Sequence, residues 1–537
     1  MEVNRLFLDA KELRCILIVS VIFSLSFPPF PFGFLTPIAF FIFLQFMDDK
    51  TPRDSFRLGY WLGLIWGAMT LFWIAASTIS GAILAIVINA FHYAIVWWIY
   101  AHFRKNQRVF ALISLPFIWV GMEYLRLFTD IRFNWLTLAH TLTYYRPLIQ
   151  IVELTGTAGL SFLIIVVSIL LYATKLIRRD FRWIPILIIV LIISGLFTYG
   201  KIRIHHLENK SYHLIKAALV QPNVDPYQKW NPDFNQEAFE MLMKESRILK
   251  SHHPHLIVWP ETATPFFLRT RLNALQKIGA FLDSTGIHLL TGTPDYEYDE
   301  KKDEFRTYNA AFFFSPKKNC FQKYYKIALV PVAESMPFKK YLPFLRKIEV
   351  GGGDFFPGRE YSIFQFNLPL FNGRYYQGEY HVEDIDSTKN VIVKLSAIIC
   401  YESIFSHIVR EFVTRGANLL TIITNDGWFG LTSGPYQHAQ FAVFRAIENR
   451  ISIIRCANTG ISGFIDPTGR YLDRAGLGIQ KNLVTWLPLR NEETFYAQHG
   501  ELFGKITLLV SFTFIFIKLI ILNFFKRSRS RLKIKYD

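Results

Sequence analysis

Long apolar runs occupy two parts of the chain, residues 13–200 and residues 503–525. A helix of about 18 or more apolar residues is long enough to cross a bilayer. The runs predict spans near residues 13–28, 33–47, 58–77, 80–103, 109–127, 158–177, 183–200 and 503–525. The first two are short and joined by a proline-rich turn, which predicts a helical hairpin with an irregular tip. The pattern therefore predicts an integral membrane protein with eight spans.

Between residues 211 and 489 the pattern changes to short apolar segments that alternate with amphipathic ones. Residues 216–221 and 391–399 are typical of strands, and residues 235–250 and 404–414 are typical of helices. Strands that alternate with helices predict an α/β domain. The predicted parts are a membrane domain of about seven transmembrane helices (1–205), the α/β domain (211–492), a C-terminal transmembrane helix (503–525) and a basic tail (526–537).

The distribution of charged residues predicts how the chain is oriented in the membrane. The net charge is +17 although only 19% of the residues are charged. The basic residues gather at the ends of alternate apolar runs, and they are Arg5, Lys11, Arg14, Lys50, Arg53, Arg57, Arg104, Lys105, Arg108, Lys175, Arg178, Arg179, Arg182, Lys526, Arg527, Arg529, Arg531, Lys533 and Lys535. With eight spans all of these lie on one side of the bilayer, which the positive-inside rule identifies as the cytoplasm. We therefore expect no nucleic-acid partner, both termini in the cytoplasm and the α/β domain on the opposite side, where only Arg132 and Arg146 weaken the pattern.

Two features stay open at this level. The four cysteines are too few for a disulfide scaffold. A bridge between Cys320 and Cys456 outside the cytoplasm is one alternative, and four free thiols are the other. Glu123 lies in an apolar run, where ionisable residues are functional candidates, but an ion pair with Arg126 explains it equally well.

The candidate chemistry lies at strand ends. Cys400 follows a strand of small apolar residues and precedes a helix-like segment, and such a turn favours the reactive thiolate. The alternative is a buried structural cysteine. Glu261 follows the strand at 256–260, at the end where open α/β sheets bind their ligands. Lys326 and Glu334 lie eight residues apart in the segment 324–334.

Several motifs occur in order along the α/β part: VQPN…KW, WPET, YYK…LVPVAESMPF, ICYES, NDGWFG and a helix that contains Gln437, His438, Arg445 and Glu448. The set resembles the nitrilase superfamily, whose Glu–Lys–Cys triad comes from three strand ends in this order. With the flanking apolar runs, the chain resembles the apolipoprotein N-acyltransferase family over nearly its whole length. The resemblance implies an α-β-β-α sandwich for residues 211–492.

The resemblance also implies roles for individual residues. Cys400 would be the nucleophile, Glu261 the general base, and Lys326 the group that stabilises the tetrahedral oxyanion together with a backbone N–H near Tyr401. Supporting roles fall to Glu334, Tyr401, Glu402 and Trp230. His438 fits the helix motif and is given no proton-transfer role. No cofactor or metal is expected, because no Cys/His cluster has ligand spacing.

The implied reaction moves an acyl chain from the sn-1 position of phosphatidylethanolamine to the α-amino group of a diacylglyceryl-cysteine lipoprotein, through a cysteine thioester. The expected setting is the bacterial inner membrane, with the catalytic domain in the periplasm and the protein a monomer. One alternative is a membrane-tethered amidase that uses water as acceptor. The other is a non-catalytic lipid-binding or transport protein, against which the intact Glu261, Lys326 and Cys400 argue.

Overall fold

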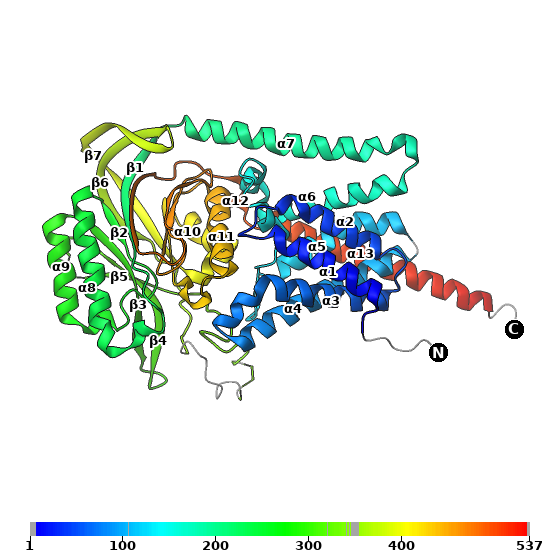
Figure 1. The fold of residues 1–537 in the computed structure, drawn as a ribbon, viewed down its shortest axis with the longest axis horizontal. Helices are drawn as coiled ribbons and strands as arrows, with labels where there is room; N and C mark the ends of the chain where they lie inside the picture. Colours follow the sequence, from blue (N-terminus) through cyan, green and yellow to red (C-terminus); the bar gives the residue numbers. More distant parts are fainter. Residues whose placement is uncertain are drawn as a thin grey trace.

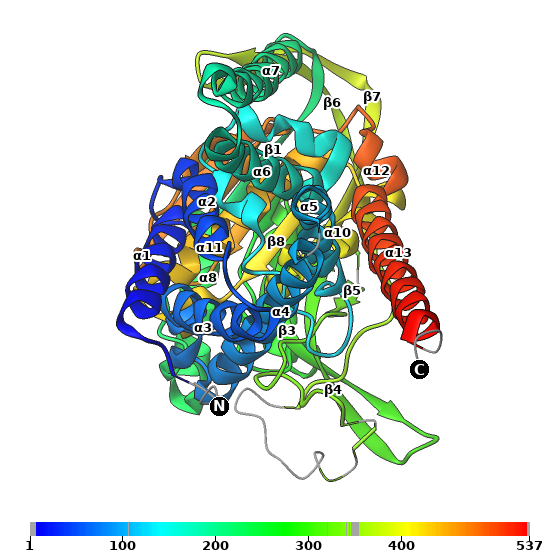
Figure 2. The same ribbon diagram turned by 90° about the vertical axis from the view of Figure 1, so that its right-hand side faces the viewer.

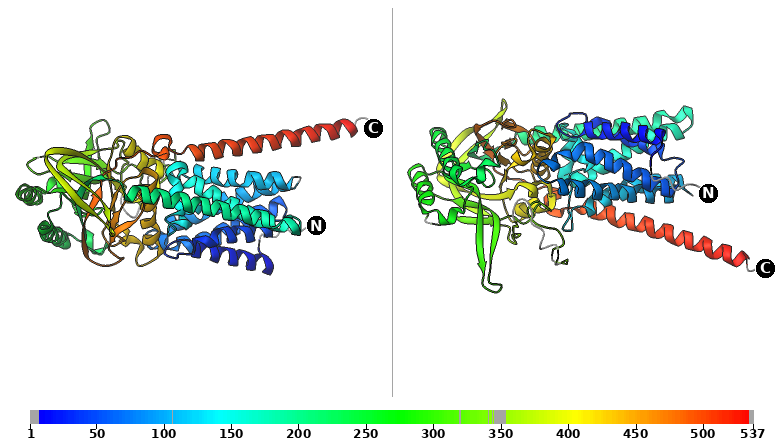
Figure 3. Two further views of the ribbon diagram at one scale, coloured as in Figure 1. Left: turned by 90° about the horizontal axis from the view of Figure 1, so that it is seen from above. Right: turned by 60° about the horizontal axis from the view of Figure 1, so that its bottom comes forward.

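The computed structural model describes residues 7–105, 107–318, 320–339, 341, 342, 344 and 354–533, apart from the side chains of residues 230, 232, 233 and 521–533. The long helices of the N-terminal part gather at one end of the molecule, and the sheet with its own covering helices lies at the other (Figure 1). Both views of Figure 3 show the same division, and Figure 2 looks along the long axis from the helical end, with the sheet behind the helices. The chain crosses between the two ends after helix α7 (Trp183–Glu208) and again before helix α13 (Leu502–Lys533).

Every predicted apolar run contains a helix. Besides α7 and α13, these are α1 (Ala10–Ser26), α2 (Thr36–Phe46), α3 (Pro52–Leu71), α4 (Ile79–Arg104), α5 (Arg108–Leu125) and α6 (Val152–Leu176). Among the described residues, six stretches are long and apolar enough to cross a membrane: Pro52–Ala76, Ile79–Arg104, Arg108–Leu125, Leu148–Leu176, Arg179–Glu208 and Leu502–Ile520. The first two helices fall short of the usual length, because α1 has 17 residues and the apolar stretch around α2 spans only Gly33–Phe46. The helical membrane domain is confirmed, whereas eight full spans stay a prediction.

The other end is built on one mixed sheet that folds into two layers. Its strands are β1 (Tyr212–Gln221), β2 (Leu256–Val258), β3 (His288–Asp299), β4 (Glu304–Phe314), β5 (Gln322–Tyr325), β6 (Phe364–Tyr376), β7 (Glu379–Ile399), β8 (Leu419–Thr424), β9 (Ile453–Ala457), β10 (Gly463–Ile465), β11 (Tyr471–Arg474) and β12 (Lys481–Pro488). They follow the order β11-β10-β9-β8-β7-β6-β1-β2-β3-β4-β5, with β12 also paired to β1. Only two residue pairs join β1 to β6, so the sheet can turn there.

Alternating side chains of β1 show how the layers pack. Ile215, Ala217 and Leu219 join a core that includes side chains of β7 and β8, whereas Ala218 and Val220 join a second core with α8 (Pro232–Leu249) and α9 (Leu272–Thr285). Because successive side chains of a strand point to opposite faces, these two cores bury both faces of β1. Helices α10 (Ser406–Thr414) and α11 (Ser433–Asn449) lie on the side that faces the membrane helices (Figure 1). This is the expected α-β-β-α arrangement, and it confirms the predicted fold class.

Candidate active site

Cys400 lies where β7 ends and a short 3-10 helix, η10 (Cys400–Ile404), begins. Its φ of 51° is in the left-handed region, which residues other than glycine rarely adopt. Contacts hold this turn: the Ser403 hydroxyl donates to the Cys400 carbonyl oxygen at 2.8 Å, and His438 Nε2 lies 3.1 Å from the same oxygen. The turn presents a half-buried sulfur at the end of a central strand. Strain of this kind is concentrated at functional sites.

Glu402 joins the cysteine turn to the segment that contains Lys326. Its fully buried carboxylate accepts hydrogen bonds from the backbone N–H groups of Ile327 at 2.6 Å, Ala328 at 3.2 Å and Ile399 at 2.7 Å. The hydroxyl of Tyr324 donates to it at 2.7 Å. Two segments more than 70 residues apart in the chain are thereby fixed relative to each other. The supporting role predicted for Glu402 would be exerted through these hydrogen bonds.

Lys326, Glu261 and Glu334 form one buried ionic cluster. Lys326 Nζ lies 2.8 Å from Glu334 Oε1 and 3.4 Å from Glu261 Oε1. Asn309 Nδ2 donates to both carboxylates, at 2.8 Å to Glu261 and 3.1 Å to Glu334. The backbone N–H of Asn425, just after β8, donates to Glu261 Oε2 at 2.9 Å. The carboxylate of Glu261 is therefore held by groups from three strands: Asn309 within β4, Lys326 just after β5 and Asn425 just after β8.

Electrostatics couple Cys400 to this cluster. Burial and the nearby Glu261 carboxylate raise the pKa of the Cys400 thiol well above its usual value, and Lys326 only partly opposes them. Burial and a neighbouring anion thus act against the strand-to-helix turn, which the sequence indicated would favour the thiolate. Burial disfavours the charged form of Lys326, but Glu334 and Glu261 outweigh it and raise the pKa of Lys326. The resting site thus holds a neutral thiol beside a firmly charged lysine, so the thiol needs a base.

The turn that positions Glu261 is packed against Gly292 of β3. A Cβ added at Gly292 would lie 2.6 Å from Glu261 Cα and 2.6 Å from Thr262 N, which is far inside van der Waals contact. We expect Gly292→Ala to displace this turn and lower acyl transfer roughly a hundredfold, since small misplacements of catalytic groups are costly. The stability loss should be about 1–3 kcal/mol, typical of overpacking. Activity and thermal unfolding measure the two effects.

Gly279 provides the matched control for that substitution. It lies in α9, and a Cβ added there would meet nothing within 4 Å. Gly279→Ala should leave activity unchanged and stabilise the helix by about 0.5–1 kcal/mol. Equal activity in both variants would contradict the packing argument for Gly292.

A second buried network of charged and polar side chains, formed by Asp426, Arg455 and His438, lies next to Cys400. Asp426 Oδ2 lies 2.9 Å from Arg455 Nη2, and Asp426 Oδ1 lies 2.7 Å from His438 Nδ1. Cys400, Asp426 and His438 offer ligand atoms within 4.8 Å of one another. These donors do not fit a metal ion well, because the Asp426 carboxylate already has a guanidinium and an imidazole as partners. His438 does not contact the sulfur through either ring nitrogen in the described hydrogen bonds.

The remaining predicted residues fall into different places. Tyr401 is buried, and its hydroxyl donates to the Arg132 carbonyl oxygen at 2.6 Å. The backbone of Trp230 lies in the 3-10 helix η6 (Gln228–Trp230), and the prediction for its side chain lies outside the described part. Glu123 does not pair with Arg126 among the described ion pairs; its carboxylate accepts from Trp119 Nε1 at 3.1 Å and from the Leu138 N–H at 3.0 Å.

The disulfide alternative is wrong. All four cysteines are free, and Cys320 is exposed whereas Cys456 is buried in β9. The Cys456 thiol lies within hydrogen-bonding distance of the backbone oxygens of Val220 at 3.3 Å and Val258 at 3.4 Å. The position of Cys456 in a buried central strand accounts for its presence as a free thiol, since free cysteine is among the most buried residue types.

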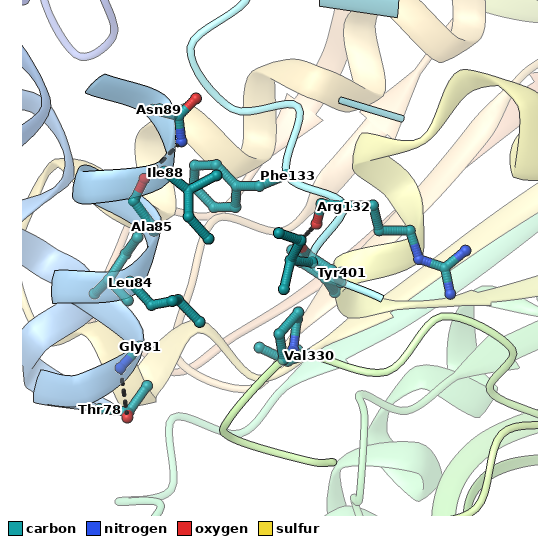
Figure 4. A pocket seen from close by; sticks show the side chains of 13 residues that line it. Thr78, Gly81, Leu84, Ala85, Ile88, Asn89, Arg132, Phe133, Val330 and Tyr401 are labelled. Atoms are coloured by element: carbon teal, nitrogen blue, oxygen red, sulfur yellow. Dashed lines mark hydrogen bonds between the residues drawn. The ribbon is translucent and has the colours of Figure 1, made fainter. Parts of the chain in front are cut away.

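An apolar cavity adjoins the site (Figure 4). Side chains of α4, among them Leu84 and Ile88, face Val330 and Tyr401 across it. Val330 belongs to the segment between Lys326 and Glu334, and Tyr401 follows Cys400 in the chain. The cavity therefore lies between helix α4 and chain segments that are adjacent in sequence to the residues of the ionic cluster and to Cys400.

Comparison with known proteins agrees with this arrangement. Residues 19–170 match the family Apolipoprotein N-acyltransferase N-terminal domain, and residues 216–485 match the family Carbon-nitrogen hydrolase. An apolipoprotein N-acyltransferase of Geobacter metallireducens is 33% identical over 90% of this chain and 91% of its own. One of Chlorobaculum tepidum is 29% identical over 92% and 93% of the two chains. A nitrilase-superfamily amidase from Nesterenkonia is 19% identical over 54% of this chain and 95% of its own, with a TM-score of 0.36.

The molecule is thus an enzyme in which a carbon-nitrogen hydrolase domain is joined to a helical membrane domain. The chain belongs to the apolipoprotein N-acyltransferase family. It is accordingly a multi-pass membrane acyltransferase that acts on lipoproteins.

Sequence reasoning missed several residues of the site. Asn309 lies within a strand and carries no local signal, because its role depends on the pairing of β4 with β5. Thr424 and Asp426 belong to the segment that ends in NDGWFG, and nothing in this motif indicates a contact with the cysteine. These contacts link residues from different strands, so only the folded chain reveals them.

Proposed function

We propose that this enzyme transfers an acyl chain in two steps through a thioester on Cys400, with a phospholipid as donor and the N-terminal amine of a diacylglyceryl-cysteine lipoprotein as acceptor. The observation that carries the proposal is the placement of Cys400, Glu261 and Lys326 in one buried cluster beside an apolar cavity. By family resemblance, the donor position is sn-1 of phosphatidylethanolamine.

In the first step Glu261 accepts the thiol proton, and the thiolate attacks the carbonyl carbon of the ester. A C–S bond forms, and the oxyanion is stabilised by Lys326 and by the backbone N–H of Tyr401. Lys326 has three N–H donors and uses two on carboxylates, so one is free for the oxyanion. The ester C–O bond then breaks, and the departing glycerol oxygen takes the proton from Glu261 as lysophospholipid.

In the second step the lipoprotein amine attacks the thioester carbonyl. Glu261 accepts a proton from the amine, the C–N bond forms and the C–S bond breaks. The proton then returns from Glu261 to the departing thiolate, which restores the neutral thiol. One base thus serves both steps. Glu334 orients Lys326, and Glu402 keeps Lys326 and Cys400 in register.

The cavity supports a lipid donor. Its lining is almost entirely apolar, and it opens between α4 and the segment that contains Val330 and Pro331. Burial of each CH₂ group contributes about 0.8 kcal/mol, so an acyl chain seated there would hold its ester near Cys400. A tethered amidase with a small soluble substrate would have no use for such a cavity beside α4.

The test is capture of the thioester. Purified enzyme incubated with phospholipid labelled in the sn-1 chain should become labelled, and hydroxylamine should release the label. Cys400→Ala should carry none. A diacylated lipopeptide should then discharge the label onto its N-terminus. Equal labelling of Cys400→Ala would refute the nucleophile, and release only as free fatty acid would favour the hydrolase.

We further propose that the enzyme is a monomer in the inner membrane, with the catalytic domain in the periplasm and both termini in the cytoplasm. The placement of the basic residues at the ends of alternate helices supports this orientation. A reporter fused after Asp537 should read as cytoplasmic, and one inserted near Lys301 as periplasmic. The opposite pair of readings would invert the orientation.

A further inference from the structure

The hydroxyl of Thr424 lies between the Cys400 sulfur and the Asp426 carboxylate. Thr424 ends β8 and is fully buried. Its Oγ1 lies 3.2 Å from Cys400 Sγ and 2.9 Å from Asp426 Oδ1. A hydroxyl has one proton to donate and two lone pairs that accept. Thr424 can therefore donate to the sulfur or to the carboxylate, but not to both at once.

The protonation state of the sulfur decides between these two arrangements. With a neutral thiol, the S–H can donate to Thr424 Oγ1 while the hydroxyl donates to Asp426. Asp426 suits this acceptor role: burial opposes its charge, but Arg455 and His438 hold its pKa well below the usual range. A thiolate has no proton to donate and accepts hydrogen bonds, so the hydroxyl then favours the sulfur.

We propose that Thr424 is a further catalytic residue, whose hydroxyl turns from Asp426 to the Cys400 sulfur when the thiolate forms and turns back when the thiol is restored. The proposal rests on the proposed function, since it takes Cys400 as the nucleophile. No proton passes through Thr424: the thiol proton goes to Glu261, and the hydroxyl keeps its own. Asp426 retains Arg455 and His438 as partners after the hydroxyl has turned.

This switch meets a need that the site creates. Burial and Glu261 raise the pKa of the thiol, and the hydrogen bond from Thr424 is one of the few local contributions that oppose them. The thiolate appears twice in the reaction, once before attack on the ester and once as the group that leaves the thioester. A hydrogen bond available only to the thiolate stabilises both species without stabilising the resting thiol.

The experiment compares Thr424→Val with Thr421→Val in the full-length purified enzyme. Valine matches the shape of threonine without the hydroxyl. Thr421 is a buried threonine of the same strand, and its hydroxyl has no described hydrogen-bond partner. Alkylation of Cys400 by iodoacetamide, followed across pH by peptide mass spectrometry, reports the thiolate fraction. The exposed Cys320 provides the internal reference.

Thr424→Val should alkylate about tenfold more slowly at a given pH, a shift of about one pH unit, as expected for loss of a hydrogen bond to a charged group. Thioester formation should fall by at least that factor, whereas Thr421→Val should match wild type in both assays. Superimposable alkylation profiles for Thr424→Val and wild type would overturn the proposal.

A second pair keeps the test valid if Thr424→Val does not fold. Thr424→Ser and Thr424→Ala differ only in the hydroxyl, so the serine variant should recover most of what the alanine variant loses. Equal profiles for this pair would also overturn the role of the hydroxyl. Failure of the nucleophile itself has a different signature, namely acyl transfer by Cys400→Ala.

Discussion

Glu261→Gln is expected to lower thioester formation by about 10²- to 10⁴-fold, the usual contribution of a positioned general base. The resting thiol is neutral because its pKa is raised, so the thiolate must be generated at the moment of reaction. Glutamine preserves the size of the side chain and can still accept a hydrogen bond from Asn309 or Asn425. It cannot take the proton. Labelling by sn-1-labelled phospholipid measures the loss.

Alkylation of Cys400 separates loss of the base from general damage to the site. Removing the Glu261 charge takes away an anion that raises the pKa of the thiol. Alkylation of Glu261→Gln by iodoacetamide should therefore be as fast as in wild type or faster, while thioester formation collapses. Glu300→Gln, at an exposed position of the β3–β4 turn, should change neither rate. A parallel loss of both rates in Glu261→Gln would indicate a structural role and contradict its assignment as base.

Glu402→Gln is expected to have the second large effect, on stability and activity together. The carboxylate accepts four hydrogen bonds, from Tyr324, Ile327, Ala328 and Ile399, and has no exposed surface. In glutamine one of the two oxygens becomes an NH₂ group, which would face backbone N–H donors. Buried donors left without acceptors cost about 1–3 kcal/mol each, so we expect a loss of about 2–5 kcal/mol.

Thermal unfolding in detergent and acyl transfer at a temperature where the variant is still folded measure these effects. We expect Glu402→Gln to be less active than wild type even at a temperature where it is folded. The backbone N–H groups of Ile327 and Ile399, which donate to Glu402, belong to the segments that contain Lys326 and Cys400, so a weaker contact should misplace both groups. Glu411→Gln provides a control, since the carboxylate of Glu411 in α10 forms its described ion pair with the exposed side chain of Arg415, which directly follows the helix. Wild-type stability in Glu402→Gln would show that the four hydrogen bonds do not hold the two segments together.

Much of the architecture could be read from the sequence. The length of the apolar runs identified the membrane-domain helices, since a continuous apolar stretch as long as residues 80–103 is typical of a transmembrane helix. The same reasoning placed the first two helices at residues 13–28 and 33–47. The structure begins α1 earlier, at Ala10, and shortens α2 to Thr36–Phe46, because a helix end depends on local turns and ion pairs as well as on the length of the apolar run. Glu12, for example, lies in the first turn of α1 and forms an ion pair with Arg57 at 2.7 Å. This turn is polar, so the apolar run alone does not reveal it.

The sequence by itself determined which residue types are present and in what order: apolar runs, alternating strands and helices, and Glu261, Lys326 and Cys400 near strand ends. These features are local, so short-range periodicity and motif order suffice to find them. Only the tertiary structure decided what surrounds each group. It brought Glu261 near the half-buried Cys400 thiol and directed the Glu402 carboxylate onto two distant backbone segments. It also left Cys456 without a disulfide partner and placed the Thr424 hydroxyl between the Cys400 sulfur and the Asp426 carboxylate. Hydrogen bonding and charge coupling act over a few ångströms between residues far apart in the chain, so the packing of the sheet layers sets them.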